Sequence, residues 1–257
     1  MANKDAPASA PGLAVVILAA GRGKRMKSDL PKVLHPLGGR TLVERVVDVA
    51  REISPDKIVV VVGHKGGMVR EALGGASVIF AEQEEQWGTA HAVSTALESL
   101  RGFAGKIVVL SGDVPLMDSS TLRALVKLRD DEGSGVALVT ADAENPFGYG
   151  RIIRSPDGRV EAVVEERDAT EAQKAVREIN AGTYVFESGF LRRALAQIKP
   201  DNDQEEYYLT DVVKIALAEW VRVSALKAPD FSRVMGVNRP EELEALEALH
   251  HKTGKAN

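Results

Sequence analysis

The chain contains the stretch Leu13-Ala-Val-Val-Ile-Leu-Ala-Ala20, and Gly21-Arg-Gly-Lys-Arg-Met26 follows at once. The first stretch is short, uncharged and β-branched in its middle, which is typical of a buried strand in a parallel sheet. The second stretch has two glycines, which permit a positive φ and let backbone N–H groups approach an anion. Positive charge beside these glycines comes from Arg22, Lys24, Arg25 and Lys32. Together they predict an α/β fold that holds a phosphate where its first strand ends.

Three interpretations of this glycine loop compete. A dinucleotide-binding loop needs a third glycine where Met26 stands and an acidic residue at the end of a second strand, so it is disfavoured. A Walker-type loop needs Gly-Lys-Ser/Thr, but Arg25 follows Gly23 and Lys24. An ordinary Gly-rich turn with solvated cations is the third interpretation, and the loop alone leaves it open.

Length and composition are those of an ordinary globular protein. The 257 residues can bury a full core, and 44% of them are hydrophobic and 27% charged. The net charge is −4 and no basic patch stands out beyond residues 22–32, so no nucleic-acid partner is expected. The absence of cysteine excludes a disulfide, a thiolate metal site and a cysteine nucleophile, and it fits a cytoplasmic location. No apolar run is long enough to span a bilayer, so no membrane partner is expected.

Strand and helix patterns alternate after the glycine loop. Strands are predicted at residues 58–62, 77–80, 107–110 and 136–140. Helices are predicted at residues 41–52, 68–73, 89–100 and 119–129. The expected N-caps are Thr41 for the first helix and Ser119 or Ser120 for the last. This alternation predicts a mostly parallel, doubly wound Rossmann-like sheet with helices on both faces and ligands beyond the carboxyl ends of its strands.

The pattern changes after residue 145. Ser155-Pro-Asp-Gly158 is a strong turn signal between two apolar stretches, so a β-hairpin laid over the first part of the chain is expected at residues 151–154 and 159–165. Further strands are predicted at residues 182–186 and 221–226. Further helices are predicted at residues 191–198, 209–219 and 240–250.

Two more motifs follow predicted strands. Ser111-Gly-Asp-Val-Pro-Leu116 places Asp113 at the carboxyl end of a strand, where α/β enzymes present ligands to a hard cation; alternatively, Asp113 caps the next turn. Gly88 and Thr89 open a helix whose free N–H groups, with the Gln83 amide, can bind a base edge or a phosphate; alternatively, this is an ordinary capped helix start. No role is assigned to the isolated histidines His35, His64 and His91.

Taken in order, the motifs resemble one family. They are Leu-Ala-Ala-Gly-x-Gly-x-Arg-Met (18–26), Pro-Lys-Val-Leu (31–34), Gln-x-x-x-x-Gly-Thr-x-His-Ala (83–92), Gly-Asp-Val-Pro-Leu (112–116), Asn-Pro-x-Gly-Tyr-Gly-Arg-Ile (145–152), Val-Glu-x-x-Asp-Ala-Thr (164–170), Glu-Ile-Asn-x-Gly (178–182), Glu-Tyr-Tyr-Leu-Thr-Asp (206–211) and Gly-Val-Asn (236–238). This series is similar to the uridylyltransferase domain of the bacterial N-acetylglucosamine-1-phosphate uridylyltransferases, a branch of the sugar nucleotidyltransferases. The resemblance runs from Leu13 to about Leu249.

The resemblance implies a Mg²⁺-assisted transfer of uridylyl from UTP to N-acetylglucosamine-1-phosphate, which gives UDP-N-acetylglucosamine and pyrophosphate. The nucleotide-binding residues that it implies are Leu18, Ala19, Ala20, Gly21, Gln83, Gly88, Thr89, Ser111 and Gly112. The implied sugar-binding residues are Gly150, Glu165, Asn180, Tyr208 and Thr210. The implied catalytic residues are Arg25 and Lys32, which grip the triphosphate, and Asp113, which would hold the metal together with Asn238.

The resemblance also divides the chain. A nucleotidyltransferase domain at residues 13–250 would comprise a nucleotide-binding part (13–144), a sugar-binding part (145–238) and a C-terminal helix (239–250). A disordered lead is expected at residues 1–12 and a frayed tail at 251–257. The bacterial enzymes usually continue into a β-helix that bears an acetyltransferase, and the sequence leaves open whether this chain is a truncated form or a single-activity enzyme. The oligomeric state is left open too.

Other interpretations stay open. Glu165 also reads as a solvated carboxylate of the hairpin, and Asn238 as the cap of the last helix. The chemistry could serve another sugar-1-phosphate or nucleoside triphosphate, or the chain could be a non-catalytic nucleotide-sugar sensor, although a sensor need not keep both triphosphate cations and a metal pair. Departures from the family pattern that bear on the sugar are Ser111 and Ala181, and a third departure is Lys24.

Overall fold

The computed structural model describes residues 12–253. Within them, nine strands form one sheet. They are β1 (Gly12–Leu18), β4 (Lys57–Val62), β5 (Ile79–Glu82), β6 (Gly105–Ser111), β7 (Val136–Asp142), β8 (Arg151–Arg154), β9 (Val160–Val164), β10 (Glu178–Glu187) and β11 (Val223–Lys227). A separate small hairpin is formed by β2 (Pro36–Leu37) and β3 (Arg40–Thr41). The predicted lead lies outside the described residues except for Gly12, which begins β1, and residues 254–257 of the predicted tail lie outside them too.

The main sheet has the strand order β11-β7-β10-β6-β1-β4-β5. β1 pairs in parallel with β4 and β6, β4 with β5, and β11 with β7. β10 is antiparallel to both of its neighbours, β6 and β7. The predicted α/β fold with a mostly parallel sheet is therefore confirmed.

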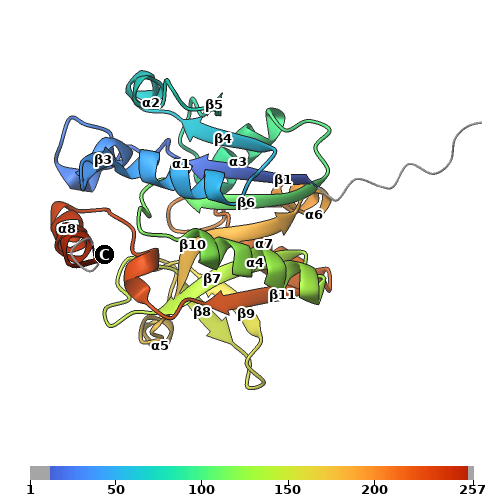
Figure 1. Cartoon of the computed structure of the whole chain (residues 1–257). Helices are drawn as coiled ribbons and strands as arrows, with labels where there is room; N and C mark the ends of the chain where they lie inside the picture. Colours follow the sequence, from blue (N-terminus) through green and yellow to red (C-terminus); the bar gives the residue numbers. More distant parts are fainter. Residues whose placement is uncertain (1–11, 254–257) are drawn as a thin grey trace, which may run out of the picture.

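Helices cover both faces of the sheet, as predicted (Figure 1). One face packs against α1 (Leu42–Glu52), α2 (Gly66–Ala72) and α4 (Ser119–Glu132). The other face packs against α3 (Thr89–Glu98), α6 (Ser188–Leu195) and α7 (Asp211–Ala218). Successive side chains of β1 enter the two cores in turn, because strand side chains alternate between faces: Val15 faces the first and Val16 the second.

The remaining elements are short or lie at the edge of the sheet. They are α5 (Glu171–Lys174), α8 (Pro240–Thr253) and the 3₁₀ helices η1 (Lys24–Met26), η2 (Lys32–Leu34) and η3 (Phe231–Val234). A third apolar cluster joins Leu246 of α8 to Met26 of η1 and to Leu37 of the small hairpin. α8 therefore packs beside the glycine loop, although more than 200 residues separate them in sequence. None of the helices in residues 12–253 has the length and the apolar composition that a bilayer crossing requires.

One predicted N-cap is confirmed, that of α1, and another, that of α4, is wrong. Thr41 caps α1 as predicted, since its Oγ1 accepts from Glu44 N at 3.3 Å while Glu44 Oε2 accepts from Thr41 N at 2.7 Å. The prediction for α4 was wrong: its N-cap is Asp118, whose carboxylate accepts from Thr121 N at 2.8 Å. A carboxylate also interacts favourably with the positive end of the helix dipole, so Asp118 is the better cap than either serine after it.

The predicted hairpin forms, but it does not lie over the sheet. β8 pairs with β9 and also with β10, where Ile179 is opposite Arg151, so the hairpin extends the main sheet. β10 begins at Glu178, four residues before the predicted start at Gly182. The register shifts between Asn180 and Tyr184, and this bulge breaks the alternation by which a strand is recognised.

Candidate functional site

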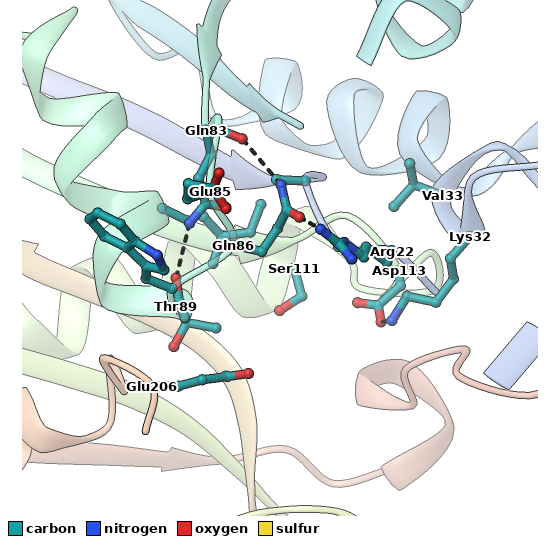
Figure 2. Close-up of a pocket in the computed structure, with 16 residues that line it drawn as sticks. Arg22, Lys32, Val33, Gln83, Glu85, Gln86, Thr89, Ser111, Asp113 and Glu206 are labelled. Atoms are coloured by element: carbon teal, nitrogen blue, oxygen red, sulfur yellow. Dashed lines mark hydrogen bonds and ion pairs between the residues drawn. The ribbon is translucent and has the colours of Figure 1, made fainter. Parts of the chain in front are cut away.

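A cavity of about 610 Å³ opens at the carboxyl ends of β1, β5 and β6 (Figure 2). It is lined by Leu18, Ala20, Gly21, Arg22, Lys32, Val33, Gln83, Glu85, Gln86, Trp87, Gly88, Thr89, Ala92, Ser111, Asp113 and Glu206. Seven of the nine residues predicted for the nucleotide are among them. Ala19 and Gly112 lie buried behind the wall, where Gly112 N donates to the Leu18 carbonyl at 2.9 Å.

One wall of the cavity is the segment that opens α3. Gly88 has a φ of 112°, and a Cβ built there would lie 2.5 Å from the carbonyl oxygen of Tyr207, so the position requires glycine. Tyr207 N donates to the Trp87 carbonyl at 2.7 Å, and Ala90 N donates to the Tyr207 carbonyl at 2.8 Å. Thr89 does not cap its own helix: its Oγ1 accepts from Leu209 N at 2.9 Å. The segment is thus tied to the chain that follows Glu206, and not merely capped.

A polar cluster lies at the other end of the cavity, and its four members are all predicted site residues. Lys32 Nζ donates to a carboxylate oxygen of Asp113 and, at 3.1 Å, to Asn238 Oδ1. Arg25 donates from Nη2 to the same Asn238 oxygen at 3.0 Å. The side chains of Lys32 and Asp113 are 17% and 16% exposed, so their ion pair is only partly screened by solvent.

Glu242 caps the start of α8. Glu242 Oε2 accepts from the backbone N–H groups of Asn238 at 2.5 Å and of Arg239 at 3.0 Å. The side chain of Asn238 is directed instead to Lys32 and Arg25. The interpretation of Asn238 as a mere helix cap therefore does not hold.

Two oxygens of this cluster, from Asp113 and Asn238, converge on one point. Asp113 and Asn238 both direct an oxygen to one nitrogen, that of Lys32, so both can reach a single cation at that point. Among residues 12–253, no group of three or more His, Cys, Asp or Glu side chains could form a cage for a metal. Mg²⁺ commonly takes only one or two protein oxygens and completes its octahedron with phosphate and water, so the donor set fits that ion.

A second polar cluster contains residues predicted for the sugar. Asn180 N donates to the Gly150 carbonyl at 2.8 Å, and a Cβ built on Gly150 would lie 3.4 Å from Glu165 Oε2. Thr210 Oγ1 donates to Glu165 Oε1 at 3.1 Å. Glu165 is therefore held between a loop residue and α7 and is not freely solvated. Tyr208, two residues before Thr210 in the sequence, is buried. Its burial raises the pKa of its hydroxyl to about 12.

The bulge of β10 carries Asn180 and reaches the wall of the cavity. Gly182 has a φ of 69° and donates from its N–H to Asn180 Oδ1 at 3.1 Å. A Cβ at Gly182 would lie 3.0 Å from Ser111 Oγ, a residue that lines the cavity. Because β10 runs antiparallel, its early residues lie at the edge where β6 and β7 end, and this places Gly182 beside Ser111 and Asn180 opposite Thr140.

A known family matches the chain over most of its length. The model of the MobA-like NTP transferase domain matches residues 15–206. The chain belongs to the MobA-like NTP transferase family. The assignment to nucleotidyltransferases that the motif order indicated is thereby confirmed, and the chain is an enzyme of that class.

Curated relatives of this MobA-like transferase are bifunctional GlmU proteins. Those of Geobacter metallireducens and Geotalea uraniireducens are 48% and 46% identical over 232 and 246 residues, which are 90% and 95% of this chain. The matched stretches are 49% and 54% of the relatives, so the chain spans about half of their length.

Two solved structures share the fold of this MobA-like transferase with a TM-score of 0.73 each. One is a UDP-glucose pyrophosphorylase complexed with UDP-glucose, at 18% identity, covering 93% of this chain and 98% of its own. The other is a putative glucose-1-phosphate thymidylyltransferase from Bacillus anthracis, at 19% identity, covering 92% and 94%. At these identities the likeness shows the fold alone.

Several lining residues escaped the sequence-based prediction. Gln86 accepts at Oε1 from Arg22 Nε at 2.9 Å and donates from Nε2 to the Gln83 carbonyl at 3.3 Å (Figure 2). Glu206 faces the cavity from the segment that holds Gly88, and Trp87 lines it although its side chain is 54% exposed. Gln86 and Trp87 stand between Gln83 and Gly88 in the sequence, which is the signal that could have identified them.

Burial raises the pKa of the Glu165 carboxyl in this MobA-like transferase. Loss of solvent raises the pKa of its carboxyl, the hydrogen bond from Thr210 lowers it, and the carboxylates of Asp168, Asp211 and Glu206 raise it further; the net pKa is raised. As the pH rises, the unfolded chain releases this proton before the folded chain does. The ionised group therefore costs stability at neutral pH, and this cost disappears once the pH falls below the pKa of the unfolded chain.

We expect Glu165→Gln to raise the melting temperature near neutral pH, because glutamine keeps an acceptor for Thr210 without a buried charge. The gain should shrink as the buffer is made acidic. Calorimetry of both proteins across that range measures it, with Glu161→Gln, an exposed change on β9, as the control that shows no shift. A lower melting temperature for Glu165→Gln at neutral pH would mean that the ionised carboxylate stabilises the fold.

Proposed function

We propose that the chain transfers uridylyl from UTP to N-acetylglucosamine-1-phosphate and releases pyrophosphate. The observation that supports this most is that one cavity has a cation cluster at its end and the bulge that carries Asn180 against its wall at Ser111. The cation cluster of Arg25 and Lys32 lies at the end of a nucleotide-sized cavity. The hydrogen-bonding cluster around Asn180 adjoins it through Gly182. Such a pair of sites suits an anionic nucleotide and a polar sugar held side by side.

The reaction needs no nucleophile from the protein. An oxygen of the sugar phosphate attacks the α-phosphorus of UTP, a new P–O bond forms, and the bond to the β-phosphate oxygen breaks with pyrophosphate carrying away the electron pair. Catalysis then rests on alignment and on neutralising negative charge at the pentacovalent phosphorus. Arg25 and Lys32 supply that charge, and Gly21 with its neighbours supplies backbone N–H groups to the phosphates.

Asp113 and Asn238 are the residues that would hold Mg²⁺. When bound, the ion would neutralise phosphate charge and help to orient the triphosphate. Lys32 contacts both oxygens in this structure, and Arg25 also contacts that of Asn238. Both cations would therefore stand beside the phosphates of a nucleotide bound at this end of the cavity.

The residues that would select the base and the sugar are assigned from the family resemblance and from their hydrogen-bonding groups. Gln83, Gly88 and Thr89 would bind uracil and ribose. Gly150, Glu165, Asn180, Tyr208 and Thr210 would bind the sugar, since a carboxylate and an amide offer acceptors and donors for hydroxyl and acetamido groups. We propose a cytoplasmic location as well, on the absence of cysteine.

A pyrophosphate-release assay tests this function directly. The panel crosses UTP, dTTP, CTP, ATP and GTP with several sugar-1-phosphates, with and without Mg²⁺. We expect turnover to be highest with UTP and N-acetylglucosamine-1-phosphate and to depend on Mg²⁺. High turnover with another pair would reassign the substrates. Tight binding of a nucleotide sugar without turnover of any pair would favour a sensor.

A further inference from the structure

His91 was assigned no role from the sequence, yet it contacts the proposed base-binding residue Gln83. It lies in the first turn of α3, half-buried, and its ring lies against that of Trp87 with the centroids 4.9 Å apart. His91 Nδ1 is 3.0 Å from Gln83 Nε2. Gln83 is 3% exposed and lines the cavity, so its amide has little room to rearrange.

The hydrogens of the Gln83 amide can be accounted for. Its nitrogen Nε2 carries two, of which one is donated to the Gly88 carbonyl at 3.2 Å and the other is directed to His91 Nδ1. An amide nitrogen only donates, so in this orientation His91 Nδ1 is the acceptor. This requires a neutral imidazole with its proton on Nε2. Gln83 Oε1 is then the amide atom left for a ligand, and it is an acceptor.

The opposite orientation of the amide is disfavoured by the Gly88 carbonyl. Turned by half a rotation, Gln83 would direct Oε1 at the Gly88 carbonyl oxygen, acceptor to acceptor, and His91 could satisfy Oε1 only by carrying its ring proton on Nδ1. The Gly88 carbonyl is held in place because it also accepts from Ala92 N at 3.1 Å at the start of α3. Two acceptors that face each other would leave polar groups unsatisfied, which is costly for an amide that is only 3% exposed.

We propose that His91 is a positioning residue that sets base specificity: it fixes the Gln83 amide so that Oε1 is presented to the cavity as an acceptor. The inference rests on the proposed function. Uracil carries a hydrogen on N3 and can donate to that oxygen. Cytosine carries a lone pair on N3, so it would face the same oxygen acceptor to acceptor. Without His91 one of the two restraints is lost, and the amide can turn to suit cytosine.

Two variants test the Nδ1 acceptor of His91 separately from the packing of its ring. His91→Phe keeps a ring against Trp87 but has no acceptor, whereas His91→Asn restores a polar group near the position of Nδ1. We expect the ratio of kcat/KM for UTP over CTP to fall at least ~10-fold in His91→Phe and to stay within ~3-fold of the parent in His91→Asn. The loss should fall on the KM for the nucleotide, with the KM for the sugar phosphate unchanged. Glu98→Ala, an exposed change on the same helix, is the control.

The results test the role of His91 separately from the proposed function. An unchanged ratio in His91→Phe, or an equal loss in His91→Asn, overturns the role of His91 while the preference of the parent for UTP upholds the function. A parent that does not prefer UTP to CTP overturns both. Should His91→Phe fail to fold, ¹⁵N NMR of the unaltered protein at neutral pH still decides: the proposal requires an unprotonated Nδ1 on His91, and a proton found there overturns it.

Discussion

Asp113→Asn is expected to lower kcat/KM for pyrophosphate release by at least ~100-fold, or about 2.7 kcal/mol of transition-state stabilisation. The carboxylate of Asp113 contacts the Lys32 ammonium, and it converges with Asn238 Oδ1 on the point where a divalent cation would be held. Asparagine keeps the size of the side chain and removes its negative charge, which is what a hard cation binds. Steady-state kinetics over a range of Mg²⁺ concentrations measures the loss.

The matched control is Asp131→Asn, which removes an exposed carboxylate of α4 that pairs with Lys127. We expect kcat/KM to change by less than ~2-fold there, since exposed ion pairs contribute little. Melting temperatures of both variants show whether the fold is intact. Mg²⁺-dependent turnover near that of the parent in Asp113→Asn would remove Asp113 from the site.

N-acetylglucosamine-1-phosphate is expected to exceed glucose-1-phosphate by ~100-fold or more in kcat/KM. The side chains of Asn180 and Glu165 are enclosed by Gly150, Thr210 and the bulge at Gly182. If these groups bind the acetamido substituent, a sugar that lacks it leaves them unpaired, at roughly 1–3 kcal/mol for each buried group. Competition kinetics with both sugar phosphates measures the ratio.

Asn180→Ala should reduce this ratio, and Glu161→Ala, an exposed change on β9, should leave it intact. Equal use of the two sugars by the unaltered protein would contradict the sugar assignment and leave a nucleotidyltransferase for another sugar phosphate. The residues to change next would then be Ser111 and Ala181, which depart from the family pattern: Ala181 is in the bulge of β10, and Ser111 lies against that bulge.

Site residues next to a strand end could be located from the sequence. The glycine loop follows β1 and Asp113 follows β6, and both strands have short apolar stretches that are easily recognised. In a parallel sheet these ends lie at one edge, so the sequence places a ligand beyond them, where Gly21, Gln83 and Asp113 follow their strands. All three line the cavity.

Contacts between distant segments could not be predicted from residue patterns. Asn238 is 206 positions from Lys32 in the sequence, and only the resemblance to a family linked them. The position of β10 was hidden for a local reason, because Gly182 and the irregular register around it make the strand look four residues shorter than it is. The choice of Asp118 over two adjacent serines depended on where α4 begins, and such boundaries are weakly encoded.

The position of β10 limits how such enzymes can be recombined. This strand follows residue 144 in the chain, yet it is seated between β6 and β7, which both precede that residue. Exchanging everything after residue 144 with a relative would force a foreign strand, including the stacked Tyr184 and Phe186, between two resident ones. The hairpin of β8 and β9 joins the sheet at the start of β10, where Arg151 is opposite Ile179. It also buries Ile152 and Val160 in the second core, so a hairpin taken from a relative has to keep apolar residues at those two positions.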